Sequence, residues 1–169
     1  MSGQGPPRVW VDTDIALGAP AGDVDDGFAL AALLAASRAG RVELLGISTV
    51  SGNASAAEAE DCARAMAAAS GVESPVLRGE SAEAAIAGLP EGARIVAIGP
   101  LSNVAAALSA APDLASRATL RLVGGNLSSR GILPPLWPHE FNLAHDRRAA
   151  RAVLSAPWRE LVLYPLDVV

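Results

Sequence analysis

The sequence predicts an α/β fold, with one domain built on a mostly parallel sheet that has helices on both faces. Short apolar segments of β type alternate with alanine-rich helical segments along the 169 residues, as in parallel sheets joined by crossover helices. The stretch "VELLGISTV" (42–50) is apolar nearly throughout, which is typical of a strand covered on both faces. Because 51% of the residues are hydrophobic and only 4% are aromatic, we expect a core of Ala, Val, Leu and Ile.

The elements follow one another in a regular order. The first strand, "RVWVD" (8–12), ends in an acidic residue, and the next helix (26–40) closes at Gly40. Ser55 and Glu58 stand at capping-box spacing and begin a helix that runs to residue 71. The remaining expected elements are strands over 74–79, 93–99, 119–125 and 160–169, and helices over 100–111 and 146–156. We expect one domain over 1–169, with a loop over 132–142 and frayed residues at 1–7.

Composition and charge exclude several classes of function. The formal net charge is −5 and all thirteen basic residues are arginine, without the basic stripe of a nucleic-acid-binding surface. The absence of lysine excludes Schiff-base chemistry and a P-loop. No apolar run reaches the roughly 18 to 20 residues of a membrane span, and no signal core is present, so we expect a cytoplasmic protein with no membrane partner. The single cysteine, Cys62, cannot form an internal disulfide and suits a reducing compartment.

Polar and glycine-rich residues follow the ends of the predicted strands. They occupy positions 12–26, 52–53, 99–100, 124–126 and 167. Ligands of parallel sheets bind beyond the carboxyl ends of the strands. The sequence therefore places the functional site at this edge.

Aspartates are concentrated after the first strand. Asp12 and Asp14 would point the same way if the strand continues through them, while Asp25 and Asp26 begin a helix, whose dipole favours carboxylates. Four converging carboxylates repel one another unless a cation lies between them, and oxygen ligands favour Ca²⁺ or Mg²⁺. The alternative is a simple helix cap in a solvated loop. We prefer the metal site.

Six stretches resemble, in the same order, motifs of the inosine-uridine-preferring nucleoside hydrolase family. They are "DTDIALGAPAGDVDDGFAL" (12–30), "STVSGN" (48–53), "VAIGPLSNVAAAL" (96–108), "VGG" (123–125), "EFN" (140–142) and "PLDVV" (165–169). The resemblance implies a truncated Rossmann-like nucleoside hydrolase fold. It also implies cleavage of the N-glycosidic bond of ribonucleosides, in purine or pyrimidine salvage.

The same resemblance implies a Ca²⁺ site. Asp14 and Asp26 would bind the ion through their carboxylates, and Ile98 through its backbone carbonyl. Asp14 would also be the catalytic group that accepts a proton from the metal-bound water. This assignment agrees with general chemistry, because a cation lowers the pKa of bound water and a neighbouring carboxylate removes the proton.

The resemblance further implies a ribose site. Asp25 would hold a ribose hydroxyl, Asn53 would contact metal-bound water or sugar, and Glu140 and Asn142 would grip the ribose. Anionic groups there would stabilise an oxocarbenium-like sugar. The structural alternatives are a turn role for Asn53 and ordinary loop positions for Glu140 and Asn142.

Other notable residues are expected to be structural. Asp146 is typical of a helix N-cap, and His139 and His145 have no spacing that suits metal or catalysis. Trp137 could stack on a nucleobase or pack its loop.

The sequence departs from the family pattern at several places. The loop 15–22 is longer than the common compact signature, the family's glycine-rich flap is not recognisable, and "RGILPPLWP" (130–138) replaces a Gly-Asn pair. The family's C-terminal part normally adds a further calcium-binding aspartate, and often a histidine that assists the leaving base. We expect the apolar terminal strand to be covered by another subunit, as in a homo-oligomer, or by the missing half of the domain.

Three functions follow from these observations. The leading one is a Ca²⁺-dependent nucleoside hydrolase. The second is a catalytically impaired hydrolase-like module that binds metal or ribosides. The third rests on "VWVDTD" (9–14), which resembles the first motif of haloacid-dehalogenase-like phosphatases. Those enzymes need a lysine further along the sequence to offset the charge of the phosphate, and this chain contains no lysine.

Overall fold

The computed structural model, which describes residues 5–18, 22, 24–127 and 140–167, contains one six-stranded sheet. All strand pairs are parallel, in the order β3-β2-β1-β4-β5-β6. The strands are β1 (Arg8–Thr13), β2 (Glu43–Thr49), β3 (Val76–Arg78), β4 (Arg94–Ala97), β5 (Thr119–Val123) and β6 (Glu160–Tyr164). This topology confirms the predicted α/β class, and β1 lies inside the sheet, where the winding direction reverses.

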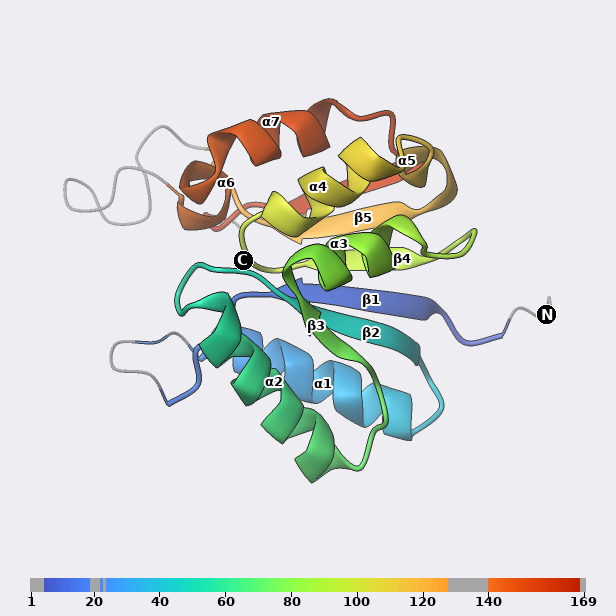
Figure 1. The fold of residues 1–169 in the computed structure, drawn as a ribbon, viewed down its shortest axis with the longest axis vertical. Helices are drawn as coiled ribbons and strands as arrows, with labels where there is room; N and C mark the ends of the chain where they lie inside the picture. The colour runs from blue at the N-terminus through green and yellow to red at the C-terminus, as the bar shows by residue number, and fades with distance from the viewer. Residues whose placement is uncertain (1–4, 19–21, 23, 128–139, 168–169) are drawn as a thin grey trace.

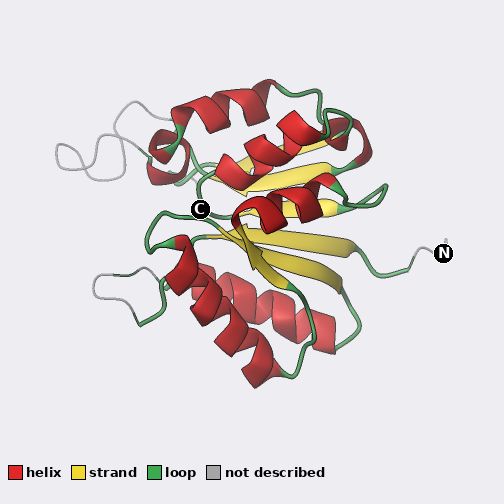
Figure 2. Cartoon of the chain, viewed as in Figure 1, coloured by secondary structure: helices red, strands yellow, loops and turns green. Residues whose placement is uncertain are grey.

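Helices cover both faces of the sheet (Figures 1 and 2). They are α1 (Asp25–Arg38), α2 (Ala56–Ser70), α3 (Gly79–Ala87), α4 (Ser102–Ala110), α5 (Leu114–Arg117), α6 (Phe141–His145) and α7 (Arg147–Ser155). Buried residues of α1 and α2 share one apolar cluster with the sheet, whereas those of α3, α4, α5 and α7 share another. None of the described helices is long and apolar enough to cross a membrane.

Strand β1 shows why its sequence is apolar. Trp10 belongs to the cluster under α3, α4 and α7, and Val11 belongs to the cluster under α1 and α2. Successive side chains of a strand point to opposite faces, and both faces of β1 are covered. Both residues are buried, which agrees with the expected strand of an α/β sheet.

Several element boundaries agree with the sequence and others differ. The capping box of Ser55 and Glu58 forms at the start of α2, and Gly71 ends that helix in a left-handed conformation with φ 70°. Three helices, α3, α5 and α6, were not expected. The two short ones have four and five residues, too few to show a helical period. Strand β6 ends at Tyr164, before the last residues of the predicted strand.

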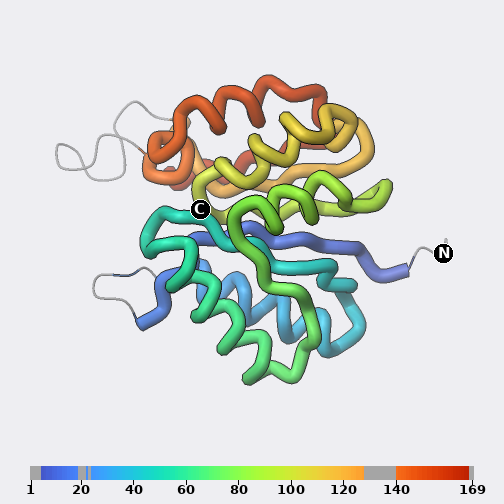
Figure 3. Tube along the Cα trace, viewed as in Figure 1, coloured from blue at the N-terminus to red at the C-terminus, as the bar shows by residue number. Residues whose placement is uncertain are grey.

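The strands run with their carboxyl ends to the left in the view of Figure 3, and the start of β1 lies at the right. At the right-hand edge, the Pro7 carbonyl accepts a hydrogen bond from the Glu43 N–H at 3.0 Å. Residues 1–4 of the segment expected to fray lie outside the described residues. The left-hand edge is the one where the aspartates gather.

Candidate active site

Asp14 is the centre of the candidate site. Strand β1 ends at Thr13, so Asp14 is the first residue beyond the carboxyl end of an inner strand. Its side chain is 1% exposed. Burial is the main cause that raises the pKa of Asp14 above its ordinary value, and the charge of Asp25 raises it further.

Two glycines and one backbone amide form the seat of the Asp14 carboxylate. The Asn53 N–H donates a hydrogen bond to Asp14 Oδ2 at 2.7 Å. A Cβ atom at Gly52 would lie 2.0 Å from Asp14 Oδ2, and one at Gly99 would lie 2.6 Å from Asp14 Oδ1. Neither contact is sterically possible without displacement, so the carboxylate occupies space that only glycine leaves free on both sides.

One oxygen of this carboxylate, Oδ1, has no hydrogen-bond partner within the described part of the chain. Among the described residues, no group donates a hydrogen bond to Asp14 Oδ1, although the atom is buried. An unpaired buried carboxylate oxygen is costly. Asp12 Oδ2 and Asn126 Oδ1 are unpaired in the same way among the described residues, but Asp14 Oδ1 is the one beside the Gly99 turn, where we expect a ligand or cation to complete it.

Asp25 and Asp26 begin α1, as the sequence indicates. Asp26 is buried, its Oδ2 accepts a hydrogen bond from the Thr13 hydroxyl, and its N–H donates to Asp25 Oδ1 at 2.8 Å. Burial, together with the charges of Asp14 and Asp25, raises the pKa of Asp26 to about 7, against the lowering effect of the Thr13 hydrogen bond. Asp25 is exposed to solvent, whereas Asp26 is buried.

Glu140 and Asn142 belong to the short helix α6. The Glu140 carboxylate caps this helix by accepting from the N–H groups of Asn142 at 2.5 Å and Leu143 at 2.8 Å. Asn142 Nδ2 donates to the backbone carbonyls of Ile98 at 2.8 Å and Val123 at 3.1 Å. Asn142 thus connects the ends of β4 and β5, and its amide lies against the carbonyl that the family resemblance assigned to calcium.

The structure brings some of the expected residues together in pairs. Asp14 contacts Asn53, and Ile98 contacts Asn142. Asn53 contributes its main-chain N–H to Asp14, while its side chain is exposed. Asp12 does not share the Asp14 seat, because its carboxylate bonds to Ser48 and Asn103 instead.

The residues expected to be structural have the following positions. Asp146 caps α7 by accepting from the Ala149 N–H at 2.9 Å, which confirms the predicted N-cap. The His145 ring lies against the Phe141 ring, with centroids 5.1 Å apart. Trp137 and His139 lie outside the described residues.

Gly52 and Gly99 were recognised in the sequence only as part of the polar edge. Their roles as walls of the Asp14 seat, and those of Thr13 and Asn103 behind it, were missed. A signal was present for the glycines, because each follows a strand that pairs with β1 and precedes a helix. Close backbone approach is a common reason for glycine at such a turn.

The metal-binding capacity of the described residues is limited. They contain no group of three or more His, Cys, Asp or Glu side chains placed to hold one ion. The oxygen donors at hand are the carboxylates of Asp14 and Asp26 and the carbonyl of Ile98. Ca²⁺ takes six to eight oxygen ligands, so water or substrate would have to supply others.

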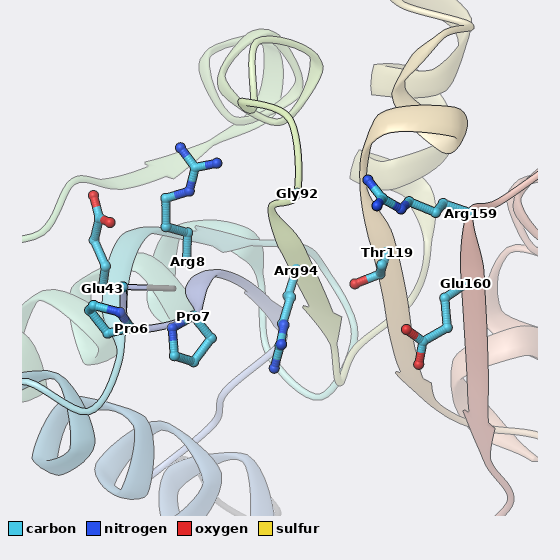
Figure 4. Close-up of a pocket in the computed structure, with 10 residues that line it drawn as sticks. Pro6, Pro7, Arg8, Glu43, Gly92, Arg94, Thr119, Arg159 and Glu160 are labelled. Atoms are coloured by element: carbon cyan, nitrogen blue, oxygen red, sulfur yellow. The ribbon is translucent and has the colours of Figure 1, made fainter. Parts of the chain in front are cut away.

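A separate hollow of about 560 Å³ lies at the opposite edge of the sheet, beside the amino ends of the strands (Figure 4). Arg8 and Arg94 line it, but their side chains extend in opposite directions in this view. Arg159, also in the lining, pairs with Glu91 at 2.7 Å. These arginines do not converge on one ligand, and the buried carboxylates lie at the other edge.

Comparison with protein families gives one match over most of the chain. The family described as inosine-uridine preferring nucleoside hydrolase matches residues 9–92 and 82–169. Among curated proteins, an uncharacterised protein of Schizosaccharomyces pombe, C1683.06c, is 40% identical over 75 residues, which are 44% of this chain and 23% of that protein. The non-specific ribonucleoside hydrolase RihC of Shigella sonnei is 39% identical over 79 residues, which are 47% of this chain and 25% of RihC.

Solved structures share the fold. A plant nucleoside hydrolase, PpNRh1, aligns with a TM-score of 0.78 at 20% identity, covering 96% of this chain and 60% of the plant chain. The inosine-uridine preferring nucleoside hydrolase of Bacillus anthracis aligns with a TM-score of 0.73 at 20% identity, covering 95% and 65%. The chain therefore spans about a quarter of these curated relatives in sequence and less than two thirds of these solved chains in structure.

Proposed function

This chain belongs to the inosine-uridine preferring nucleoside hydrolase family, and we propose that it is an N-ribohydrolase that cleaves the N-glycosidic bond of ribonucleosides with Ca²⁺-activated water. The observation that carries the proposal is the Asp14 carboxylate. It is buried between Gly52 and Gly99, and its Oδ1 has no hydrogen-bond partner among the described residues. Such an atom is expected where a ligand completes the site.

The residues present fit a hard cation. Asp14 and Asp26 are buried carboxylates, and the charge of Asp14 raises the pKa of Asp26, so a cation between them would offset this repulsion. All donors at hand, including the Ile98 carbonyl, are oxygen atoms, which suits Ca²⁺ better than zinc. Asp14, Asp26 and Ile98 are therefore the residues that would hold the ion, which when bound supplies an oriented water of lowered pKa.

Asp14 is the proposed catalytic residue of the chain. Its Oδ2 is held by the Asn53 N–H, which leaves Oδ1 as the oxygen that accepts a proton from the attacking water. The raised pKa of Asp14 makes its carboxylate a better proton acceptor than an ordinary aspartate. Burial keeps bulk water away from the carboxylate, so Asp14 would take a proton only from a water held at the site.

The ribose would bind on the solvent side of this seat. Asp25 is exposed at the start of α1. Its Oδ1 accepts from the Asp26 N–H, and its other oxygen would accept from a sugar hydroxyl. Asn53 presents an exposed side chain from the neighbouring turn. Glu140 and Asn142 are buried, with Glu140 capping α6 and Asn142 bonded to the Ile98 carbonyl, so they would contact the sugar through acceptor lone pairs beyond those bonds. Negative charge around the ribose stabilises the cationic sugar as the bond breaks.

The test is a hydrolysis assay with inosine and uridine in the presence of Ca²⁺, with release of reducing sugar as the readout. We expect turnover by the wild-type chain, loss of at least about 100-fold in Asp14→Asn, and little change in Asp113→Asn, an exposed aspartate far along the chain. Folded wild-type protein without turnover on either nucleoside would overturn the proposed activity.

A second function is a module that binds a cation or ribosides without turnover. One observation favours it: the Asp26 carboxylate and the Ile98 carbonyl, which would hold the ion, already accept hydrogen bonds from the Thr13 hydroxyl and from Asn142 Nδ2. Calorimetry with CaCl₂ and with ribose separates the two functions, because the binding module takes up both ligands while releasing no base from nucleosides.

A further inference from the structure

A group of buried polar side chains lies directly behind the Asp14 seat. Asp12 is fully buried, and its Oδ1 accepts hydrogen bonds from the Ser48 hydroxyl at 2.5 Å and from Asn103 Nδ2 at 2.8 Å. The Trp10 indole N–H donates to Ser48 Oγ at 2.8 Å. These four residues form one connected network between the inner strands and α4, and burying it is costly unless its members are paired.

Asn103 makes a second bond that the other members do not make. Its Nδ2 also donates to the backbone carbonyl of Thr49 at 3.1 Å. Thr49 is the last residue of β2, and Asn103 lies in the first turn of α4. One amide nitrogen therefore connects β1, through Asp12, with the end of β2 and with α4.

The two glycines beside the Asp14 carboxylate lie in turns next to the residues that Asn103 connects. Gly52 and Asn53 come three and four positions after Thr49, in the turn that leaves β2. Gly99 comes before Asn103, in the turn that enters α4. A shift of either turn changes the space around the Asp14 carboxylate, because neither glycine has room for even a Cβ atom beside it.

We propose that Asn103 is a positioning residue for the candidate cation site, acting by holding the turn after β2 and the start of α4 against Asp14. The inference rests on the proposed function in one respect, namely that the seat binds a cation. The positioning itself is a property of the metal-free chain. Residues that orient a metal ligand from outside the coordination sphere commonly change metal affinity by 10- to 100-fold.

The test compares Asn103→Ala and Asn103→Leu with Ser48→Ala. Both Asn103 variants lose the bonds to Asp12 and to Thr49. Ser48→Ala loses a bond to the same Asp12 oxygen but leaves the Thr49 contact in place, so it is the matched control within the network. Ser109→Ala, an exposed position later in α4, controls for changes in that helix.

The main readout is amide hydrogen exchange of Asn53 in the metal-free protein, measured by NMR. The Asn53 N–H is bonded to Asp14 Oδ2, so its protection reports the seat directly. We expect exchange about tenfold faster or more in both Asn103 variants, beyond any change at the Leu120 amide in the core. We expect much smaller effects in Ser48→Ala and Ser109→Ala.

Calorimetry with CaCl₂ is the second readout, with an expected loss of about tenfold in affinity for the Asn103 variants. Asn53 exchange that matches the Ser109→Ala protein would overturn the positioning role, whatever the calcium result. Equal acceleration by Ser48→Ala would also overturn it, because the Thr49 contact would then be irrelevant. Wild-type protein that binds no calcium would sink the proposed metal site alone, since the exchange experiment needs no metal.

Discussion

Two glycines determine where the Asp14 carboxylate can lie. Gly52 and Gly99 belong to turns that follow different strands, yet each would place a Cβ within 2.6 Å of an Asp14 oxygen. Neither glycine has a positive φ. Glycine is therefore needed at these two positions for space and not for backbone conformation. Sequence reasoning that looks for glycine in left-handed turns would not have found them.

Adding a methyl group at either wall should displace Asp14. We expect Gly52→Ala and Gly99→Ala to lower the free energy of unfolding by roughly 1–3 kcal/mol and the calcium affinity by about tenfold or more. Urea unfolding and calorimetry with CaCl₂ measure the two effects.

Gly88→Ala is the matched control for these variants. A Cβ there would lie 3.4 Å from its nearest neighbour, in ordinary contact, and the φ of Gly88 is −85°. We expect a change of no more than about 1 kcal/mol, which could be stabilising. If the two wall variants behave like Gly88→Ala, the seat is not as tight as the contacts indicate.

At the scale of the elements, α7 depends on one carboxylate at its start. Asp146 accepts from the Ala149 N–H at 2.9 Å and from the Ser102 hydroxyl of α4 at 2.8 Å. It therefore caps α7 and joins it to the helix that carries Asn103. Two hydrogen bonds lower the pKa of Asp146 below its ordinary value. The bond from the Ala149 N–H has the larger effect and the bond from the Ser102 hydroxyl the smaller one.

Replacing this cap should destabilise the fold while the bonds of Asn103 to Asp12 and Thr49 stay in place. We expect Asp146→Ala to lower the free energy of unfolding by about 0.5–2 kcal/mol, as measured by urea denaturation. Because the folded pKa is depressed, the stabilisation is present above the unfolded pKa and is lost as the pH falls through the folded pKa. Calcium affinity should stay near the wild-type value in this variant. A large loss of affinity would mean that α7 bears on the site.

At the scale of the whole molecule, stability should depend on pH through the buried aspartates. Burial raises the pKa of Asp12 to about 7, and burial with neighbouring charges does the same for Asp26. These pKa values lie above the ordinary value of 3.8, so the folded chain holds protons that the unfolded chain releases. The stabilising contribution is therefore complete below the unfolded pKa and is lost as the pH rises towards 7.

The expected result is a metal-free protein that becomes less stable between about pH 4 and pH 7, by up to about 1.4 kcal/mol per pH unit for each such carboxyl. Urea unfolding in EDTA across this range measures it. Added CaCl₂ should restore stability most at the upper end, where the carboxylates are ionised.

Asp26→Asn is the informative variant for this pH dependence. An amide removes the titration and keeps the shape of the side chain, so we expect a flatter profile in EDTA and weaker stabilisation by calcium. A wild-type profile that rises steadily over the same interval would contradict the raised pKa values of Asp12 and Asp26.

By itself the sequence determined the fold class, the family and the edge of the sheet at which the aspartates lie. Alternating strands and helices are local patterns, and motifs such as "DTD" and "EFN" are contiguous, so each can be recognised without knowing what lies beside it. The N-caps at Ser55 and Asp146 were predictable for the same reason, since a cap bonds within its own first turn.

Only the tertiary structure decided which groups meet at Asp14. Its neighbours Gly52, Asn53 and Gly99 come from turns that are separated from it by whole helices and strands. The order of the strands, with β2 and β4 on either side of β1, brings those turns together. The alternation of side chains along a strand predicts which face of the sheet a residue lies on, but not which residues it contacts there. Asp14 could therefore be proposed as the proton acceptor from the sequence, whereas the residues that surround it could not be predicted.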